Sequence, residues 1–286
     1  MIKFYTYDSQ EPGPRLAVMG AVHGDEVCGT HALRRIMEKI DGGSLKLLKG
    51  SLLAIPVANP RAYEQNIRFT EENLNRVYIE SDVPSSYEHK LAQELMRQLA
   101  GCDALVDLHS IHTKGWPFAM HFGFFSDAEE NLIQSLGLPY VVEGWEEAYM
   151  ASLPALAGEK SQHSATFMHR QGKIAAGVEC GEHADPAAVD VAESVILRAM
   201  DHLGIIDAKL PPAAVPKRVH MKKVFMKQHA GGVLTQNFTH GQPIKKGDVL
   251  ATYPDSAITA EEDGLILFPR PACPLNEEWF YTGRLA

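Results

Sequence analysis

The sequence lacks three features that would each point to a particular class of protein: paired cysteines, long apolar runs and an excess of positive charge. Its four cysteines, Cys28, Cys102, Cys180 and Cys273, lie far apart and form no Cys-x-x-Cys pair. Neither a disulfide framework nor a four-cysteine zinc module is therefore predicted. We expect reduced and mostly buried thiols, as in cytoplasmic proteins.

No apolar run approaches the roughly 18 residues of a membrane-spanning helix, and residues 1–15 lack the apolar core of a signal peptide. The 27 Lys and Arg residues against 36 Asp and Glu residues give a formal net charge of −9, which does not favour nucleic-acid binding. These absences predict a cytoplasmic protein with neither a membrane nor a nucleic acid as its partner.

Apolar segments of strand length alternate with segments of helical periodicity over the first two thirds of the chain. The predicted strands are 16–22, 51–58, 104–108 and 174–179, and the predicted helices are 26–40, 86–100 and 185–204, the last with Asp185 as its N-cap. A short strand near 118–125 and a helix near 127–136 are also expected, whereas 59–84 reads as a long polar loop of the kind that is often functional. This alternation predicts a mostly parallel, doubly wound α/β sheet.

The composition changes at the proline-rich segment 210–216, which cannot continue a helix and is typical of a linker. Short β-like runs broken by Gly and Pro follow it. We therefore predict two domains, a larger α/β domain over 1–208 and a smaller all-β domain over 217–286.

Three predicted strands end next to side chains capable of metal or acid–base chemistry: His23 and Glu26, then His109, then Glu179. Ligands of open α/β sheets bind at the carboxyl ends of the strands. Two histidines and one carboxylate form a common catalytic zinc set that leaves one position open, and a further carboxylate, here Glu179, can move protons. The spacing alone leaves other histidines open as ligands, namely His112, His121, His163, His169 and His183.

The polar loop adds a second group of candidate residues, Arg68, Asn75 and Arg76. A guanidinium offers two parallel hydrogen bonds to a carboxylate, which a lysine cannot match. These residues indicate a substrate that carries an anionic group.

Several motifs then match one known family in order over about residues 20–185. They are G-A-V-H-G-D-E at 20–26, N-P-R-A at 59–62, R-F at 68–69, L-N-R at 74–76, D-L-H at 107–109 and G-V-E-C-G at 177–181. This set resembles the succinylglutamate desuccinylase/aspartoacylase family, a branch of the zinc carboxypeptidase superfamily. The linker and the β-rich tail are also similar to this family.

The resemblance implies a role for each matched residue. His23, Glu26 and His109 would hold one Zn²⁺ per subunit, and Glu179 would act as general base and then general acid. Arg68 would stabilise the developing oxyanion together with the metal.

On the substrate side, the resemblance implies that Asn75 and Arg76 bind the α-carboxylate. Aspartoacylases carry a further arginine about ten residues before the catalytic glutamate, and this sequence has His169 there, with Arg170 beside it. A shift of one residue would bring Arg170 into the role of reading the substrate side chain, and the sequence does not decide between the two.

The tail has its own resemblance, because I-K-K-G-D-V-L-A at 244–251 and A-E-E-D-G-L-I at 260–266 are similar to half of a lipoyl- or biotinyl-type barrel-sandwich. No exposed-turn lysine signature accompanies them, so attachment of a prosthetic group is not predicted.

Together these observations predict a zinc-dependent hydrolase that cleaves an N-acyl amino acid, of the succinylglutamate or N-acetylaspartate type, into a carboxylic acid and a free amino acid. One alternative is a metallo-carboxypeptidase or peptide amidase that acts on short peptides. A second is a non-catalytic protein that binds acyl amino acids. The sequence is compatible with a homo-oligomer but fixes neither the number of subunits, the acyl group, nor zinc over cobalt or manganese.

Overall fold

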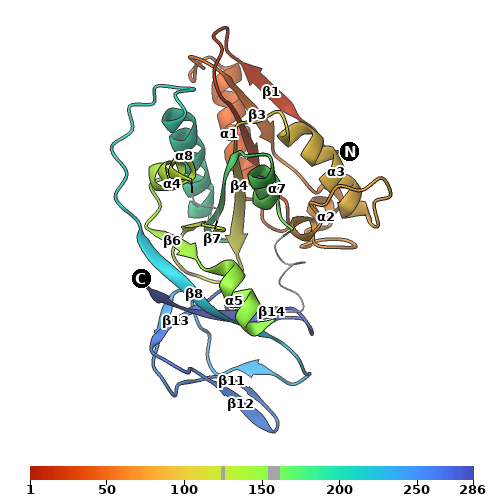
Figure 1. Ribbon diagram of the computed structural model, residues 1–286, viewed down its shortest axis with the longest axis vertical. Coiled ribbons are helices and arrows are strands. Elements are labelled where there is room, and N and C mark those ends of the chain that lie inside the picture. Colours follow the sequence, from red (N-terminus) through yellow and green to blue (C-terminus); the bar gives the residue numbers. More distant parts are fainter. Residues whose placement is uncertain (124–125, 154–161) are drawn as a thin grey trace.

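A central sheet of eleven strands organises the chain in the computed structural model, which describes residues 1–123, 126–153 and 162–286 (Figure 1). Within these residues the strand order is β1-β3-β2-β4-β7-β5-β6-β8-β14-β13-β10. The pairs β3–β2, β2–β4, β4–β7, β5–β6 and β6–β8 are parallel. The predicted α/β class, with a mostly parallel central sheet and a C-terminal β-rich part, is confirmed.

The strands before residue 217 are β1 (Tyr5–Asp8), β2 (Arg15–Met19), β3 (Ser51–Ile55), β4 (Ala104–Ile111), β5 (Phe118–Met120), β6 (Tyr140–Glu143) and β7 (Ile174–Glu182). The helices are α1 (Cys28–Asp41), α2 (Pro60–Gln65), the 3₁₀ turn η1 (Leu74–Arg76), α3 (Tyr87–Leu99), α4 (Asp127–Ser135), α5 (Trp145–Ser152), α7 (Ser164–Arg170) and α8 (Ala187–His202).

Both faces of the central strands are buried, which explains why their sequences are continuously apolar. In β2, Leu16 and Val18 pack into a core beneath α1, α4 and α8, whereas Ala17 and Met19 pack into a second core beneath α3 and α7. Figure 1 shows these two helical layers on opposite sides of the sheet. Helices therefore cover both faces of the sheet. A ligand site can form at the carboxyl ends of the strands.

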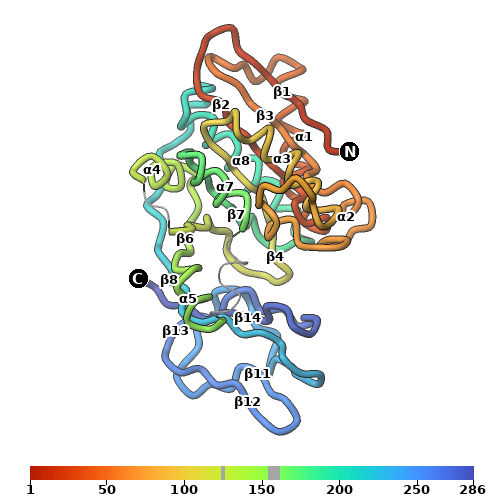
Figure 2. Tube along the Cα trace, turned by 45° about the vertical axis from the view of Figure 1, so that its right-hand side comes forward, coloured from red at the N-terminus to blue at the C-terminus, as the bar shows by residue number. Residues whose placement is uncertain are grey.

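Residues 217–286 form strands and turns, namely β8 (Lys217–Met226), β9 (Val233–Leu234), β10 (Gln242–Ile244), β11 (Val249–Tyr253), β12 (Ser256–Thr259), β13 (Gly264–Leu267) and β14 (Glu278–Leu285). Strand β8 pairs with β6 and β14 pairs with β8, so the central sheet continues into this part of the chain. Figure 2 shows these strands gathered at the end of the molecule to which β4 points. An independent domain over 217–286 stays a prediction.

Several sequence expectations differ from the structure in detail. The segment 59–84 contains α2 and η1, and the strand predicted at 104–108 continues through His109 to Ile111. Helix α8 begins at Ala187 after Pro186, although the Asp185 carboxylate still accepts a hydrogen bond from the backbone N–H of Ala187 at 2.9 Å. Strand β6 and helices α5 and α7 lie in the region for which the sequence predicted little.

The four cysteine thiols are free and buried, as expected. Across the three described ranges, no helix is both long enough and apolar enough to cross a membrane.

Candidate active site

The candidate site lies at the carboxyl ends of three neighbouring parallel strands, β2, β4 and β7. His23 and Glu26 stand on the short connection between β2 and α1, His109 belongs to β4, and Glu179 belongs to β7. This connection is tightly packed, because a Cβ atom on Gly24 would come within 2.0 Å of the backbone of Ala62 in α2. The fold therefore brings together the residues that the sequence singled out at three separate strand ends.

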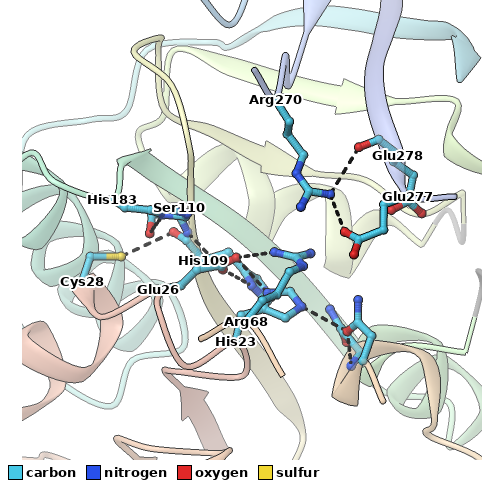
Figure 3. Close-up of polar contacts among 12 residues, drawn as sticks. His23, Glu26, Cys28, Arg68, His109, Ser110, His183, Arg270, Glu277 and Glu278 are labelled. Atoms are coloured by element: carbon cyan, nitrogen blue, oxygen red, sulfur yellow. Dashed lines mark hydrogen bonds and ion pairs between the residues drawn. The ribbon is translucent and has the colours of Figure 1, made fainter. Parts of the chain in front are cut away.

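His23, Glu26 and His109 converge on one point (Figure 3). The Glu26 carboxylate lies between the two imidazoles, with Oε1 2.8 Å from His23 Nδ1 and Oε2 2.8 Å from His109 Nδ1. One potential ligand atom from each of the three residues lies within 4.8 Å of the other two, and all three residues are buried. The set has the residue types and the mutual proximity of a two-histidine, one-carboxylate metal site.

The hydrogen bonds of His23 show that these atoms fit a cation. Its Nε2 lies 3.1 Å from Asn73 Oδ1, which also accepts the backbone N–H of Asn75, so Nε2 is the donor. Burial and the charge of Arg68 lower the pKa of His23, which favours the neutral ring. The Nδ1 lone pair then faces Glu26 Oε1, and within the described chain Nδ1 has no hydrogen-bond partner. Two acceptors facing each other at 2.8 Å are stabilised by a cation between them.

The Asp107 carboxylate lies behind His109, with Oδ1 3.2 Å from the ring Nε2. Burial disfavours the charged form of His109, but the carboxylates of Asp107 and Glu26 outweigh it and hold its pKa well above the usual value. A carboxylate behind a ligating histidine fixes the ring orientation and raises its basicity. The Ser164 hydroxyl holds Asp107 in turn by donating to its Oδ2 at 2.6 Å.

Glu26 accepts two further hydrogen bonds. Arg68 Nη1 donates to Glu26 Oε1 at 2.8 Å, and the backbone N–H of Ser110 donates to Oε2 at 3.3 Å. Burial alone would raise the pKa of Glu26, but the two histidines hold it well below its usual value. The carboxylate is therefore ionised and able to act as a ligand.

Glu179 lies beside this cluster without joining its hydrogen bonds. Burial, followed by the negative charge of Glu26, raises the pKa of Glu179 to about 8. Its Oε2 is buried and has no hydrogen-bond partner among the described residues. A carboxyl group whose pKa lies near neutrality is suited to taking and returning a proton.

A cavity of about 220 Å³ opens from the cluster and is lined on one side by Asn75 and Arg76. Asn75 is buried and accepts a hydrogen bond from the backbone N–H of Ser164 at 3.1 Å. Arg76 Nη1 donates to the carbonyl oxygen of Asn75 at 2.8 Å, which holds the guanidinium at the cavity wall.

The segment that carries Arg68, Asn75 and Arg76 is anchored by a buried carboxylate that the sequence analysis missed, Glu88 of α3. Its Oε1 accepts the N–H and hydroxyl of Thr70, each at 2.7 Å, and the side-chain amide of Asn59 at 3.2 Å. Its Oε2 accepts the backbone N–H groups of residues 71 and 72, each at 3.2 Å. These bonds outweigh burial and lower the pKa of Glu88. The only sequence signal was an acidic residue on the apolar face of a predicted helix.

The C-terminal strands supply a further part of the cavity wall that sequence spacing did not reveal. Arg270, Glu278 and Tyr281 line the cavity, with Glu278 Oε1 3.8 Å from Arg76 Nη2. The Arg270 guanidinium donates to Glu277 Oε2 at 2.8 Å, as Figure 3 shows. The aromatic side chains of Phe122, Trp145 and Tyr149 also face this space.

Neither residue proposed to read the substrate side chain is brought to the cavity. Arg170 is exposed and bonds Gln162, and His169 pairs with the buried Glu129. The reason is the direction of the strand that follows. Both residues precede the amino end of β7, where Glu129 also accepts the backbone N–H of Ala175 at 3.0 Å, whereas the cluster lies at the carboxyl ends.

Comparison with known proteins shows the family of this chain. Residues 12–203 match the sequence model of the succinylglutamate desuccinylase/aspartoacylase catalytic domain. The chain belongs to the succinylglutamate desuccinylase/aspartoacylase family.

Two relatives illustrate the range of the family. An N-alpha-acetyl-L-2,4-diaminobutyric acid deacetylase of Halomonas elongata is 24% identical over 92% of this chain and 80% of its own length. An N-acyl-aromatic-L-amino acid amidohydrolase of Rattus norvegicus is 36% identical over 36% of this chain and 35% of its own length.

Solved structures share the fold over nearly the whole chain. A succinylglutamate desuccinylase/aspartoacylase from Rhodobacter sphaeroides has a TM-score of 0.78 at 16% identity, covering 100% of this chain and 90% of that one. The ectoine utilization protein EutE (DoeB) from Ruegeria pomeroyi also has a TM-score of 0.78, at 21% identity, covering 98% of this chain and 88% of that one.

Proposed function

We propose that this chain hydrolyses the amide bond of an N-acyl amino acid, with one Zn²⁺ per chain held by His23, Glu26 and His109. The observation that carries the proposal is the convergence of these three buried side chains beside Glu179. The names of the relatives, a deacetylase and an amidohydrolase, support the same reaction class.

Zinc supplies the electrophilic part of this chemistry, since it activates water and polarises a carbonyl group. Glu179 accepts the proton of the attacking water and then delivers it to the nitrogen of the leaving amine. Its burial and raised pKa suit both halves of this transfer. Arg68, whose guanidinium reaches the cavity beside Glu26, donates a hydrogen bond to the oxygen on which negative charge develops.

Arg76 and Asn75 fix the α-carboxylate of the substrate. The Nε of Arg76 is buried and has no hydrogen-bond partner in the part of the chain that the structure describes. The guanidinium lines the cavity, and its fork of N–H groups suits two parallel hydrogen bonds to a carboxylate.

The site does not determine which amino-acid side chain the substrate carries. Arg170 takes no part in the proposal, because its guanidinium lies outside the cavity. The described wall instead offers the carboxylates of Glu146 and Glu278 together with the aromatic rings of Trp145 and Tyr149. Substrates with basic and aromatic side chains therefore belong in any test beside the acidic N-acetylaspartate and succinylglutamate.

The decisive experiment measures free-amine release from N-acetyl and N-succinyl derivatives of acidic, basic and aromatic amino acids and from short peptides. Protein stripped with a chelator is compared with the same protein reloaded with zinc. We expect zinc-dependent release from one of the acyl amino acids. Activity on peptides alone would replace the proposal with a carboxypeptidase, and tight ligand binding without turnover at full zinc occupancy would replace it with a binding protein.

A further inference from the structure

A second group of metal-binding side chains adjoins the first and has no role in the proposed reaction. It consists of Asp25, His112 and His183, and one nitrogen or oxygen atom from each lies within 4.8 Å of those from the other two. The three residues come from the ends of the same three strands, after β2, β4 and β7 respectively. The fold thus assembles a two-histidine, one-carboxylate set twice along one sheet edge.

Two atoms of this group are buried polar atoms without a partner. Asp25 Oδ1 and His183 Nε2 are inaccessible to solvent and make no hydrogen bond to any described residue. The rings of His112 and His183 meet edge to face, with their centroids 4.4 Å apart. Burying polar atoms without partners is costly unless something binds them.

Ser110 fixes the orientation of His183. Its hydroxyl oxygen lies 2.8 Å from His183 Nδ1, and the backbone N–H of His183 donates to the carbonyl oxygen of Ile111 at 2.9 Å. When Nδ1–H donates to the serine, the lone pair of Nε2 points away from Ser110. This is how an outer contact prepares a histidine to ligate a metal. Figure 3 shows Ser110 between His183 and Glu26.

We propose that Asp25, His112 and His183 form a second binding site for a divalent transition-metal ion, beside the first. Two imidazoles and one carboxylate suit Zn²⁺, Co²⁺ or Ni²⁺ rather than Mg²⁺ or Ca²⁺, which prefer oxygen ligands. Water completes the coordination, because His112 lines the open cavity.

This second site is weaker than the first. His112 is exposed, whereas all three residues of the first group are buried.

The test measures Co²⁺ bound per chain by equilibrium dialysis of the metal-free full-length protein, together with the visible absorption of the bound ion. Wild-type protein is expected to bind two ions, the second more weakly. His183→Ala and Asp25→Asn are each expected to lose the weaker ion and keep the tighter one. The matched control His31→Ala, which removes an exposed histidine of α1, is expected to keep both.

The outcomes separate the two metal sites. Two ions bound by both His183→Ala and Asp25→Asn, or a single ion in wild-type protein that both variants still bind, overturns the second site. The variant His109→Gln should lose the tighter ion alone. If His109→Gln binds as wild type while His183→Ala loses an ion, the zinc centre of the proposed function fails and the second site stands. Circular dichroism spectra that match wild type show that each variant is folded.

Discussion

His109 and Glu179 are direct neighbours across the parallel pair β4–β7, in register with each other. Residues that face each other on adjacent strands lie about 4.8 Å apart and project to the same side of a sheet. The backbone register therefore sets the separation between a candidate metal ligand and the candidate proton carrier. Both residues belong to strands of the central sheet, so the pairing of these strands fixes their relative positions.

The first prediction concerns Glu179. We expect Glu179→Gln to lower kcat by a factor on the order of 10² to 10⁴, because an amide cannot accept the proton of water. Zinc content is expected to stay near one equivalent at the first site, since Glu179 makes no hydrogen bond to His23, Glu26 or His109. Steady-state kinetics with elemental analysis check both quantities.

A matched control for this variant is Glu182→Gln, which changes a carboxylate of the same strand that does not line the cavity. Near-normal turnover by Glu179→Gln would remove Glu179 from the mechanism.

The second prediction concerns removal of the metal. Without a cation, the lone pair of His23 Nδ1 faces Glu26 Oε1 at 2.8 Å, so the apo protein should be less stable. Zinc at 100 times its dissociation constant should raise the free energy of unfolding by about 2.7 kcal/mol. Thermal melts with and without zinc measure this as a shift in Tm. A Tm that is the same in both states, or a zinc-dependent shift that is as large in His109→Gln as in the wild type, would argue against the first site.

Much of this site was predictable because its residues follow apolar strand segments. The run over 16–22 and the segments that end at His109 and Glu179 are buried on both faces, so their sequences are unambiguous. Parallel strands then carry their C-terminal residues to one edge, which is a property of the topology. For this reason local sequence placed the candidate ligands at one edge of the sheet, although spacing alone left other histidines open as ligands.

The remainder of the cavity depends on contacts between distant segments. Arg270 and Glu278 reach it only because β14 pairs with β8 and β8 pairs with β6, a relation that no local pattern encodes. Arg170 illustrates the converse error. Along the chain it lies only one residue from the position that the family pattern gives, but the intervening strand carries Glu179 away from it towards the opposite end of the sheet.

The third prediction concerns Arg76. We expect Arg76→Lys to raise KM by about tenfold or more, equivalent to about 1.4 kcal/mol, because lysine cannot form two parallel bonds to a carboxylate. The change in kcat should be smaller, since Arg76 contacts the substrate away from the reacting carbonyl. Steady-state kinetics measure the separate effects on KM and kcat for this variant and for the control Arg170→Lys, which changes an exposed arginine. An equal effect of the two substitutions would contradict the assignment of Arg76.

The fourth prediction concerns Glu88, which accepts five hydrogen bonds beneath the segment that holds Arg68, Asn75 and Arg76. In Glu88→Gln, the side-chain N–H₂ group faces N–H and O–H donors and cannot accept their hydrogen bonds. We therefore expect a loss of about 1–3 kcal/mol in the free energy of unfolding at pH 7. A fall in kcat/KM should accompany it as the arginine segment loosens. The exposed carboxylate of Glu80 provides the control Glu80→Gln.

The pH dependence of unfolding distinguishes this role of Glu88 from simple packing. Its pKa is lower in the folded protein than its ordinary value, so the ionised carboxylate stabilises the fold fully above about pH 4.3. This contribution is lost as the pH falls through the folded-state pKa. Urea unfolding of wild type and Glu88→Gln should therefore give a difference in free energy that is largest at neutral pH and shrinks in acid. A difference that is constant with pH would mean that the shape of the side chain, and not its charge, holds the segment in place.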